Sequence, residues 1–177
     1  MEEALNNSID EKTTSLVFYH NPYTKIKFVN EITNSYKIPL FYVDFDLLFS
    51  GYYESQLISE KQNLEILRPT EQNLLQIISE LIKKTSLQKS IIIFDSLNGL
   101  YTTINENPDS GRFIESLLMF LSYNLKFSNS KFFILSLAEK KEDEWVLSPT
   151  KRHILENENV NRLQIEENNQ NLQIHVL

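Results

Sequence analysis

The chain has 177 residues, no cysteine, three glycines and a formal net charge of −7 at neutral pH. The lack of cysteine excludes disulfides, thiolate zinc sites and cysteine nucleophiles, and the acidic charge argues against strong generic nucleic-acid binding, which depends on lysine and arginine. No apolar run approaches the ~20 residues of a membrane span, and the acidic amino terminus is unlike a signal peptide. We therefore expect one domain in the cytoplasm, or in the nucleus of a eukaryote, with no membrane contact.

Strand and helix patterns alternate after residues 1–13, which we expect to be a flexible polar lead. Continuous apolar stretches indicate buried strands, and apolar residues three or four apart indicate helices. On these criteria the first half contains a strand over 15–20, a helix over 25–36, a strand over 38–44, a loop with a short helix over 50–60, and a short strand over 64–67.

The second half continues the alternation. We expect Thr70 to cap a helix, with Asn73 at the capping-box position. The helix buries Leu74, Ile77, Ile78, Leu81 and Ile82, and a later amphipathic helix carries Phe113, Leu117, Leu118, Phe120 and Leu121. Strands are predicted over 90–95, 131–137, 160–165 and 171–176, with a polar loop around 105–111, a charged excursion over 139–144 and a return toward the body over 145–147.

This order predicts an α/β fold: a single domain over 14–177, with a mainly parallel central sheet flanked by helices and a C-terminal antiparallel hairpin. The most informative strand reads Ile91-Ile92-Ile93-Phe94-Asp95-Ser96. An apolar run that ends in Asp-Ser is typical of the magnesium-binding strand of a P-loop ATPase. The usual companion is a glycine-rich loop that wraps phosphate groups, but residues 18–27 contain no glycine.

Four stretches together resemble the RecA-like recombinase family, in particular its archaeal RadA/RadB and KaiC-type branches. They are residues 16–22, which are similar to the strand entering the phosphate loop; 40–46, similar to the strand that ends in Asp-x-Glu; 63–69 with 91–101; and 149–156 leading into 160–165. The likeness spans residues 14–177 and implies a RecA-like P-loop NTPase fold.

The chain departs from this family where phosphate should bind. His20 and Tyr23 stand where the family has glycines, and side chains there block the close approach of the backbone to phosphate. The lysine of the loop aligns with Lys25, Ile26 or Lys27, and none of these is followed by the expected magnesium-binding hydroxyl.

Other catalytic positions differ as well. By the resemblance, Asp46 replaces the catalytic glutamate, and Leu135-Ser136-Leu137 replaces the polar sensor. Phosphoryl transfer depends on positioning and charge stabilisation, so we expect hydrolysis to be lost. The vestigial nucleotide site would comprise Thr24, Lys25, Lys27, Asp46, Asp95 and Ser96.

Each site residue also has a structural interpretation. Asp95 either binds magnesium or caps a neighbouring helix. Lys25 and Lys27 either meet an anion at a helix start or are solvated on either side of a buried Ile26. Asp44 and Asp46 are expected to face opposite sides of a strand, which disfavours a carboxylate pair.

No metal site is expected from His20, His153 and His175, which are scattered in the sequence. Residues 140–144 lie where the family's second DNA-contacting loop would lie, and their mixed charge favours a solvated hairpin tip. A possible interface comprises Trp145, Lys151 and Arg152.

The resemblance implies a non-catalytic RecA-like paralogue, not an enzyme, that assembles with RecA-like partners as a hetero-oligomer and serves DNA recombination and repair. It would require no cofactor; ATP and magnesium would bind only if the degenerate site is retained. Nucleic acid would bind weakly or through the complex. The alternatives are an Elongator-accessory-like ring subunit in tRNA modification and a divergent ATPase that uses Lys25 or Lys27 with Asp46 and Asp95.

Overall fold

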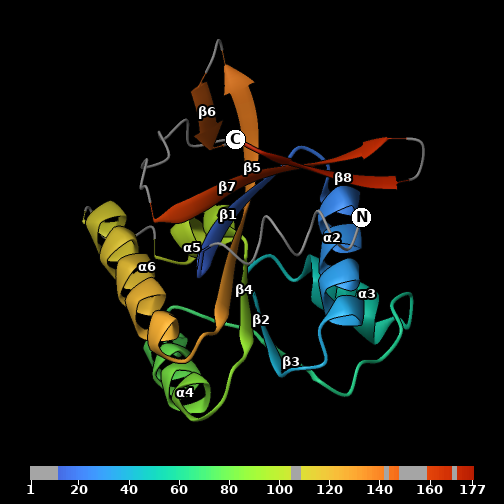
Figure 1. The fold of residues 1–177 in the computed structure, drawn as a ribbon. Helices are drawn as coiled ribbons and strands as arrows, with labels where there is room; N and C mark the ends of the chain where they lie inside the picture. Colours follow the sequence, from blue (N-terminus) through green and yellow to red (C-terminus); the bar gives the residue numbers. More distant parts are fainter. Residues whose placement is uncertain (1–11, 105–108, 142–143, 148–158, 169–170) are drawn as a thin grey trace.

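The structure is a computed structural model that describes residues 12–104, 109–141, 144–147, 159–168 and 171–177. Its strands form one sheet in the order β3-β2-β4-β5-β1-β7-β8, and β6 pairs with an extension of β5 (Figure 1). The strands are β1 (Thr14–Tyr19), β2 (Leu40–Asp44), β3 (Leu64–Leu67), β4 (Ile91–Asp95), β5 (Lys131–Lys141), β6 (Glu144–Leu147), β7 (Val160–Asn168) and β8 (Asn171–Val176).

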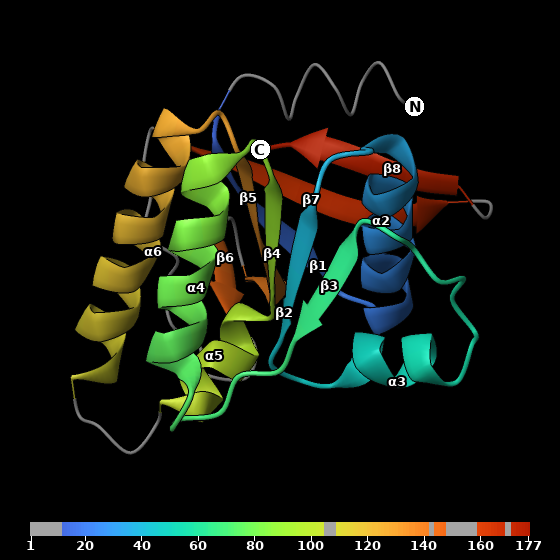
Figure 2. The same cartoon turned by 90° about the horizontal axis from the view of Figure 1, so that it is seen from below.

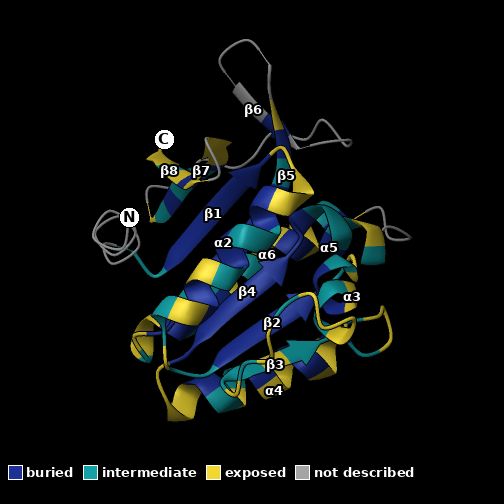
Figure 3. Ribbon diagram, turned by 90° about the vertical axis from the view of Figure 1, so that its right-hand side faces the viewer, coloured by how far each residue is buried: buried dark blue, intermediate teal, exposed yellow. Residues whose placement is uncertain are grey.

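Helices cover both faces of the sheet (Figure 2). One face packs against α4 (Leu74–Leu87), α5 (Leu97–Thr103) and α6 (Ser110–Phe127), and the other packs against α2 (Pro22–Ser35) and α3 (Leu48–Glu54). Alternate residues of β1 enter the two cores: Leu16 and Phe18 the first, Val17 and Tyr19 the second. A strand that is buried on both faces is apolar throughout, which explains the unbroken runs of the sequence (Figure 3).

The predicted topology is confirmed. The pairs β1–β5, β1–β7, β2–β3, β2–β4 and β4–β5 are all parallel, and β7–β8 is the antiparallel C-terminal hairpin. The charged excursion belongs to an antiparallel β5–β6 hairpin, although residues 142–143 lie outside the described residues. Residues 1–11 of the predicted lead also lie outside the described residues. Its last residue, Thr13, is bound to the sheet, because its carbonyl accepts a hydrogen bond from the Phe132 amide at 2.8 Å.

The capping box predicted for Thr70 and Asn73 is present: Asn73 Oδ1 accepts from the Thr70 amide at 2.6 Å, and Thr70 Oγ1 accepts from the Asn73 amide at 3.4 Å. The regular turns of α4 begin only at Leu74. Helix α5 was not predicted. In α6, Phe113 and Phe120 are exposed, because the buried side of the helix is formed by other positions, namely Ile114, Leu117, Leu121 and Leu125. No helix in the described part of the chain is long and apolar enough to cross a membrane.

Candidate functional site

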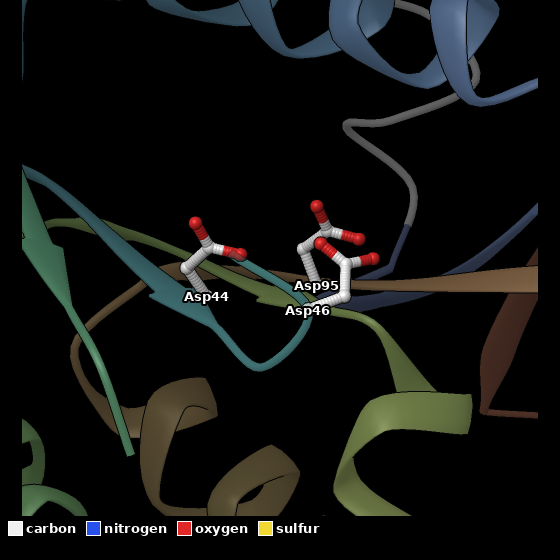
Figure 4. A group of neighbouring side chains, drawn as sticks. All are labelled: Asp44, Asp46 and Asp95. Atoms are coloured by element: carbon white, nitrogen blue, oxygen red, sulfur yellow. The ribbon is translucent and has the colours of Figure 1, made fainter. Parts of the chain in front are cut away.

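Three acidic residues gather where parallel strands end at one edge of the sheet. Asp44 closes β2 and lies in register with Asp95, which closes β4. Asp46 follows in the turn after β2, and the three carboxylates each place an oxygen within 4.8 Å of the others (Figure 4). The expectation that Asp44 and Asp46 face apart was wrong, because β2 ends at Asp44 and strand alternation stops there.

Lys25 enters this cluster from the first turns of α2. Its side chain is 1% exposed, and its Nζ atom lies 2.8 Å from Asp46 Oδ2 and 2.8 Å from Asp95 Oδ2. The side chain is directed inward because Lys25, Phe28, Val29 and Ile32 share the buried stripe of the helix. The sequence therefore uses a core position for a cation, and two carboxylates provide the compensating charge that burial requires.

The beginning of α2 satisfies its own backbone. Pro22 occupies the first turn, and Asn21 Oδ1 accepts from the Tyr23 amide at 2.9 Å. The Asn21 carbonyl accepts from the amides of Thr24 and Lys25 at 3.0 and 3.3 Å. These amides are the groups that a helix start would otherwise offer to a phosphate. They are already bonded within the chain.

Two tyrosines complete the surroundings of the buried charges. The hydroxyl of Tyr42, which is fully buried in β2, donates to Asp95 Oδ2. The ring of Tyr19, at the end of β1, lies 5.4 Å from Lys25 Nζ, within the range of a cation–π contact. Asp95 Oδ1 is buried and has no hydrogen-bond partner in the described part of the chain.

Burial sets the protonation of this cluster. Burial raises the pKa of Asp95 to about 7, although the Lys25 ammonium acts in the opposite direction. Burial alone would lower the pKa of Lys25, but the Asp95 and Asp46 carboxylates hold it above its ordinary value, so Lys25 is a cation at neutral pH. Burial also raises the pKa of Tyr19 to about 12 and that of Tyr42 well above its ordinary value.

Asp44 has a separate set of partners. It accepts from the amides of Leu47 and Ser50 at 2.9 and 2.8 Å, and from the Ser50 hydroxyl. Arg68 Nε donates to Ser50 Oγ at 3.1 Å, and its guanidinium forms an ion pair with Glu54. This network fixes the turn between β2 and α3, so Asp44 organises the backbone that carries Asp46.

The segment after β4 is fixed to β5. Ser96 caps α5 by accepting from the Gly99 amide at 3.1 Å. The side chain of Asn98 bonds both backbone groups of Leu137: its Oδ1 accepts at 2.9 Å and its Nδ2 donates at 3.2 Å. Ser136 Oγ also donates to Asn98 Oδ1 at 3.3 Å. Asp95 is thus followed by a rigid helix start.

Comparison with known proteins relates this chain to others by structure. No protein-family model and no curated protein matches the chain. A KaiC-like protein from the hyperthermophilic archaeon Pyrococcus horikoshii OT3 matches 94% of this chain and 78% of its own chain, with a TM-score of 0.52 and 15% sequence identity. This chain has a RecA-like fold. At that identity the likeness concerns the fold alone.

Within this RecA-like fold, the predicted site residues separate into two groups. Lys25, Asp46 and Asp95 are in contact, and Thr24 is a buried residue of α2. Lys27 is not part of the cluster, because it pairs with Glu167 of β7. The prediction of two solvated lysines around a buried Ile26 was wrong: Lys25 is buried, and Ile26 is only partly so.

The other predicted site and interface residues lie at the start of the helix after β4, in β6 and outside the described residues. Ser96, not Asp95, caps the following helix. Trp145 belongs to β6, but its side chain lies outside the described part of the structure, as do Lys151 and Arg152 entirely. Tyr42 was missed by the sequence analysis, because an interior strand tyrosine is ordinarily a core residue.

The carboxylates do not fit magnesium as they are arranged. Magnesium requires near-octahedral oxygen coordination. Asp95 Oδ2 is already bonded by Lys25 and Tyr42, and Asp46 Oδ2 by Lys25, while both oxygens of Asp44 accept from the turn. The one acceptor of Asp95 that remains is Oδ1. The ammonium group of Lys25 is therefore the cation that this cluster accommodates.

Proposed function

We propose that this protein is a non-catalytic RecA-like subunit that acts by assembling with other RecA-like proteins, as an accessory factor in DNA recombination and repair. The observation that carries the proposal is the ion-pair cluster in which Lys25 and Asp95, both buried, and Asp46, which is exposed, are in contact. By resemblance, Asp46 and Asp95 correspond to the catalytic acid and the magnesium-binding acid, and Lys25 is one of the three positions that align with the phosphate-loop lysine. Here they neutralise one another.

The energetics support a site that does not load nucleotide. A phosphate group that recruits Lys25 would leave Asp46 and the fully buried Asp95 without their cation. Removing one partner of a buried ion pair costs about 3–5 kcal/mol, so nucleotide binding would begin with a penalty of that order. The bonded amides at the start of α2 and the absence of glycine in residues 18–27 act in the same direction.

The role in recombination is proposed from the resemblance of the sequence alone. RecA-like domains pack side by side with the nucleotide edge of one facing its neighbour, so a chain without chemistry still supplies a face to a partner. The net charge of −7 favours protein partners over direct binding of DNA.

The experiment is to mix the purified chain with the RecA-like recombinase of its own organism and single-stranded DNA. We expect a complex of the two proteins and a slower loss of recombinase from the DNA, measured by fluorescence anisotropy. If the two proteins form no complex and the dissociation rate of the recombinase is unchanged, the proposal is contradicted. If instead the chain binds tRNA in preference to single-stranded DNA and has the mass of a ring, the Elongator-like alternative is favoured.

One observation favours a second candidate, a divergent ATPase. Three carboxylates and a lysine converge at the sheet edge, and these are the groups that such an enzyme would need. Turnover of saturating Mg-ATP that is abolished by Asp95→Ala, but kept by Lys27→Ala, would establish it. Absence of turnover in the intact chain would remove it.

A further inference from the structure

Helix α6 has two apolar sides, and only one of them packs against the described part of the protein. Ile114, Leu117, Leu121 and Leu125 face the core. A second set of apolar side chains is exposed to between 39% and 73%. These residues are Phe113, Met119, Phe120, Tyr123 and Phe127, and they are called the outer stripe below.

The outer stripe has the spacing of a helix–helix seam. Phe113, Phe120 and Phe127 are seven residues apart, and Tyr123 falls between the last two at the three–four spacing of a heptad. The rings of Tyr123 and Phe127 lie 5.0 Å apart in an edge-to-face arrangement. The stripe is therefore continuous along the helix.

The stripe is large enough to be an interface. With about 200 Å² for each large side chain, the exposed fractions amount to about 600 Å². A stable interface buries about 800 Å² on each partner, so these five residues alone supply about three quarters of that area. Helix α6 lies beside α4 at the outer border of its helical layer, on the face of the sheet opposite α2 (Figures 1 and 2).

The stripe is also complementary to itself. In an antiparallel pair of helices related by a two-fold axis near Phe120, Phe113 of one helix is level with Phe127 of the other. Residues 116–125 carry no charge, and Glu115 and Lys126 bound this stretch on the same flank. Antiparallel pairing brings equal flanks together, so Glu115 of each helix meets Lys126 of the other.

We propose that α6 forms a homodimer interface, with the outer stripe packed antiparallel against the same stripe of a second copy of this chain. This interface leaves the edge with Lys25 and Asp95 uncovered, so it is compatible with a further RecA-like partner there. It does not depend on the proposed loss of nucleotide binding.

Sedimentation equilibrium of the full chain between about 1 and 200 µM tests this interface. We expect a mass of two chains at the upper concentrations. Phe120→Glu, which places a charge on the two-fold axis of both copies, should weaken the dimer by at least about tenfold. Leu75→Glu on α4, where the leucine is similarly exposed, is the matched control and should leave the dimer intact.

A charge exchange tests the antiparallel orientation. Glu115→Lys creates two like-charge contacts and should weaken the dimer by about fivefold, whereas Glu115→Lys combined with Lys126→Glu should restore it. A chain that stays monomeric at 200 µM would overturn the proposal, and the stripe would then belong to a partner of another sequence. A dimer that is insensitive to Phe120→Glu, or that the double exchange fails to restore, would overturn it equally.

Discussion

The ammonium nitrogen of Lys25 lies 2.8 Å from Oδ2 of Asp95, which joins the start of α2 to the carboxyl end of β4. Neither residue is exposed by more than 1%. The contact places an ammonium group and a carboxylate in the interior, at the carboxyl end of the parallel strands. Its consequences for stability can be measured separately from any function.

Replacing Lys25 should be strongly destabilising. Lys25→Met keeps the length of the side chain but removes the cation from Asp46 and Asp95, and we expect a loss of about 3–5 kcal/mol in the free energy of unfolding, measured by urea denaturation. Lys27→Met is the control, because Lys27 is partly exposed and pairs with Glu167 at the surface. An exposed pair contributes about 0–1 kcal/mol. Equal losses in the two variants would contradict the buried ion pair.

Stability should also depend on pH through Asp95. Its pKa is raised from 3.8 to about 7 by burial, so the folded chain binds this proton more tightly than the unfolded chain. The contribution is complete below about pH 4 and is lost as the pH rises through 7, by at most about 1.4 kcal/mol for each pH unit.

Asp95→Asn should remove this pH dependence. The amide keeps an oxygen that accepts from Tyr42, and Asp46 still pairs with Lys25. Burial raises the pKa of Asp44 as well, so a smaller slope of the same sign should remain. Urea midpoints at pH 4.5, 5.5, 6.5 and 7.5 measure the difference between the two proteins. Parallel slopes would show that Asp95 is not the group that titrates.

Two glycines should respond to alanine in opposite ways. A Cβ atom at Gly99 would lie 2.6 Å from Phe45 Cβ, so Gly99→Ala should cost about 1–3 kcal/mol by overpacking. Nothing lies within 4 Å of a Cβ atom at Gly51, in α3, so Gly51→Ala should stabilise the protein by about 0.5–1 kcal/mol through the backbone entropy of the unfolded chain. A neutral Gly99→Ala would mean that α5 does not pack closely on the turn after β2.

Asn98 should be essential for the position of α5. Asn98→Ala leaves the amide and the carbonyl of Leu137 without the partners described above, and unsatisfied groups of this kind cost about 1–3 kcal/mol each when they are buried. Asn98→Asp should retain the bond from the Leu137 amide but repel the Leu137 carbonyl. Its melting temperature is expected to lie between those of the intact chain and Asn98→Ala. Thermal denaturation of the three proteins ranks them. The same melting temperature for all three would exclude this role.

Much of the fold was predictable because parallel strands that are buried on both faces have unbroken apolar sequences. The runs that end at Asp44 and Asp95 predicted the neighbouring strands β2 and β4 and placed both carboxylates at one edge. Helix α5 could not be recognised in this way, since Leu97–Thr103 contains a glycine and two threonines and is stabilised by the Ser96 cap and by Asn98.

The pairing of Lys25 was harder to predict because its partners are distant in sequence. A signal was present, however: the stripe of Phe28, Val29 and Ile32 extends back by one helical turn to Lys25, not to Ile26 or Lys27. A lysine on a buried stripe requires an acid, and Asp46 and Asp95 are two of the three acids at that edge. Asp46 was misjudged because strand alternation was extended beyond the end of β2.

Calorimetric titration of the intact chain with Mg-ATP and Mg-ADP, to millimolar ligand at pH 7, tests the central claim most directly. Asp95→Asn serves as the control, since it removes the acid that resembles the magnesium ligand. The account predicts no heat of binding for either nucleotide, because Lys25 remains paired with Asp46 and Asp95. Saturable binding by the intact chain that is lost in Asp95→Asn would contradict it, and would show that this lysine leaves its carboxylates to hold phosphate.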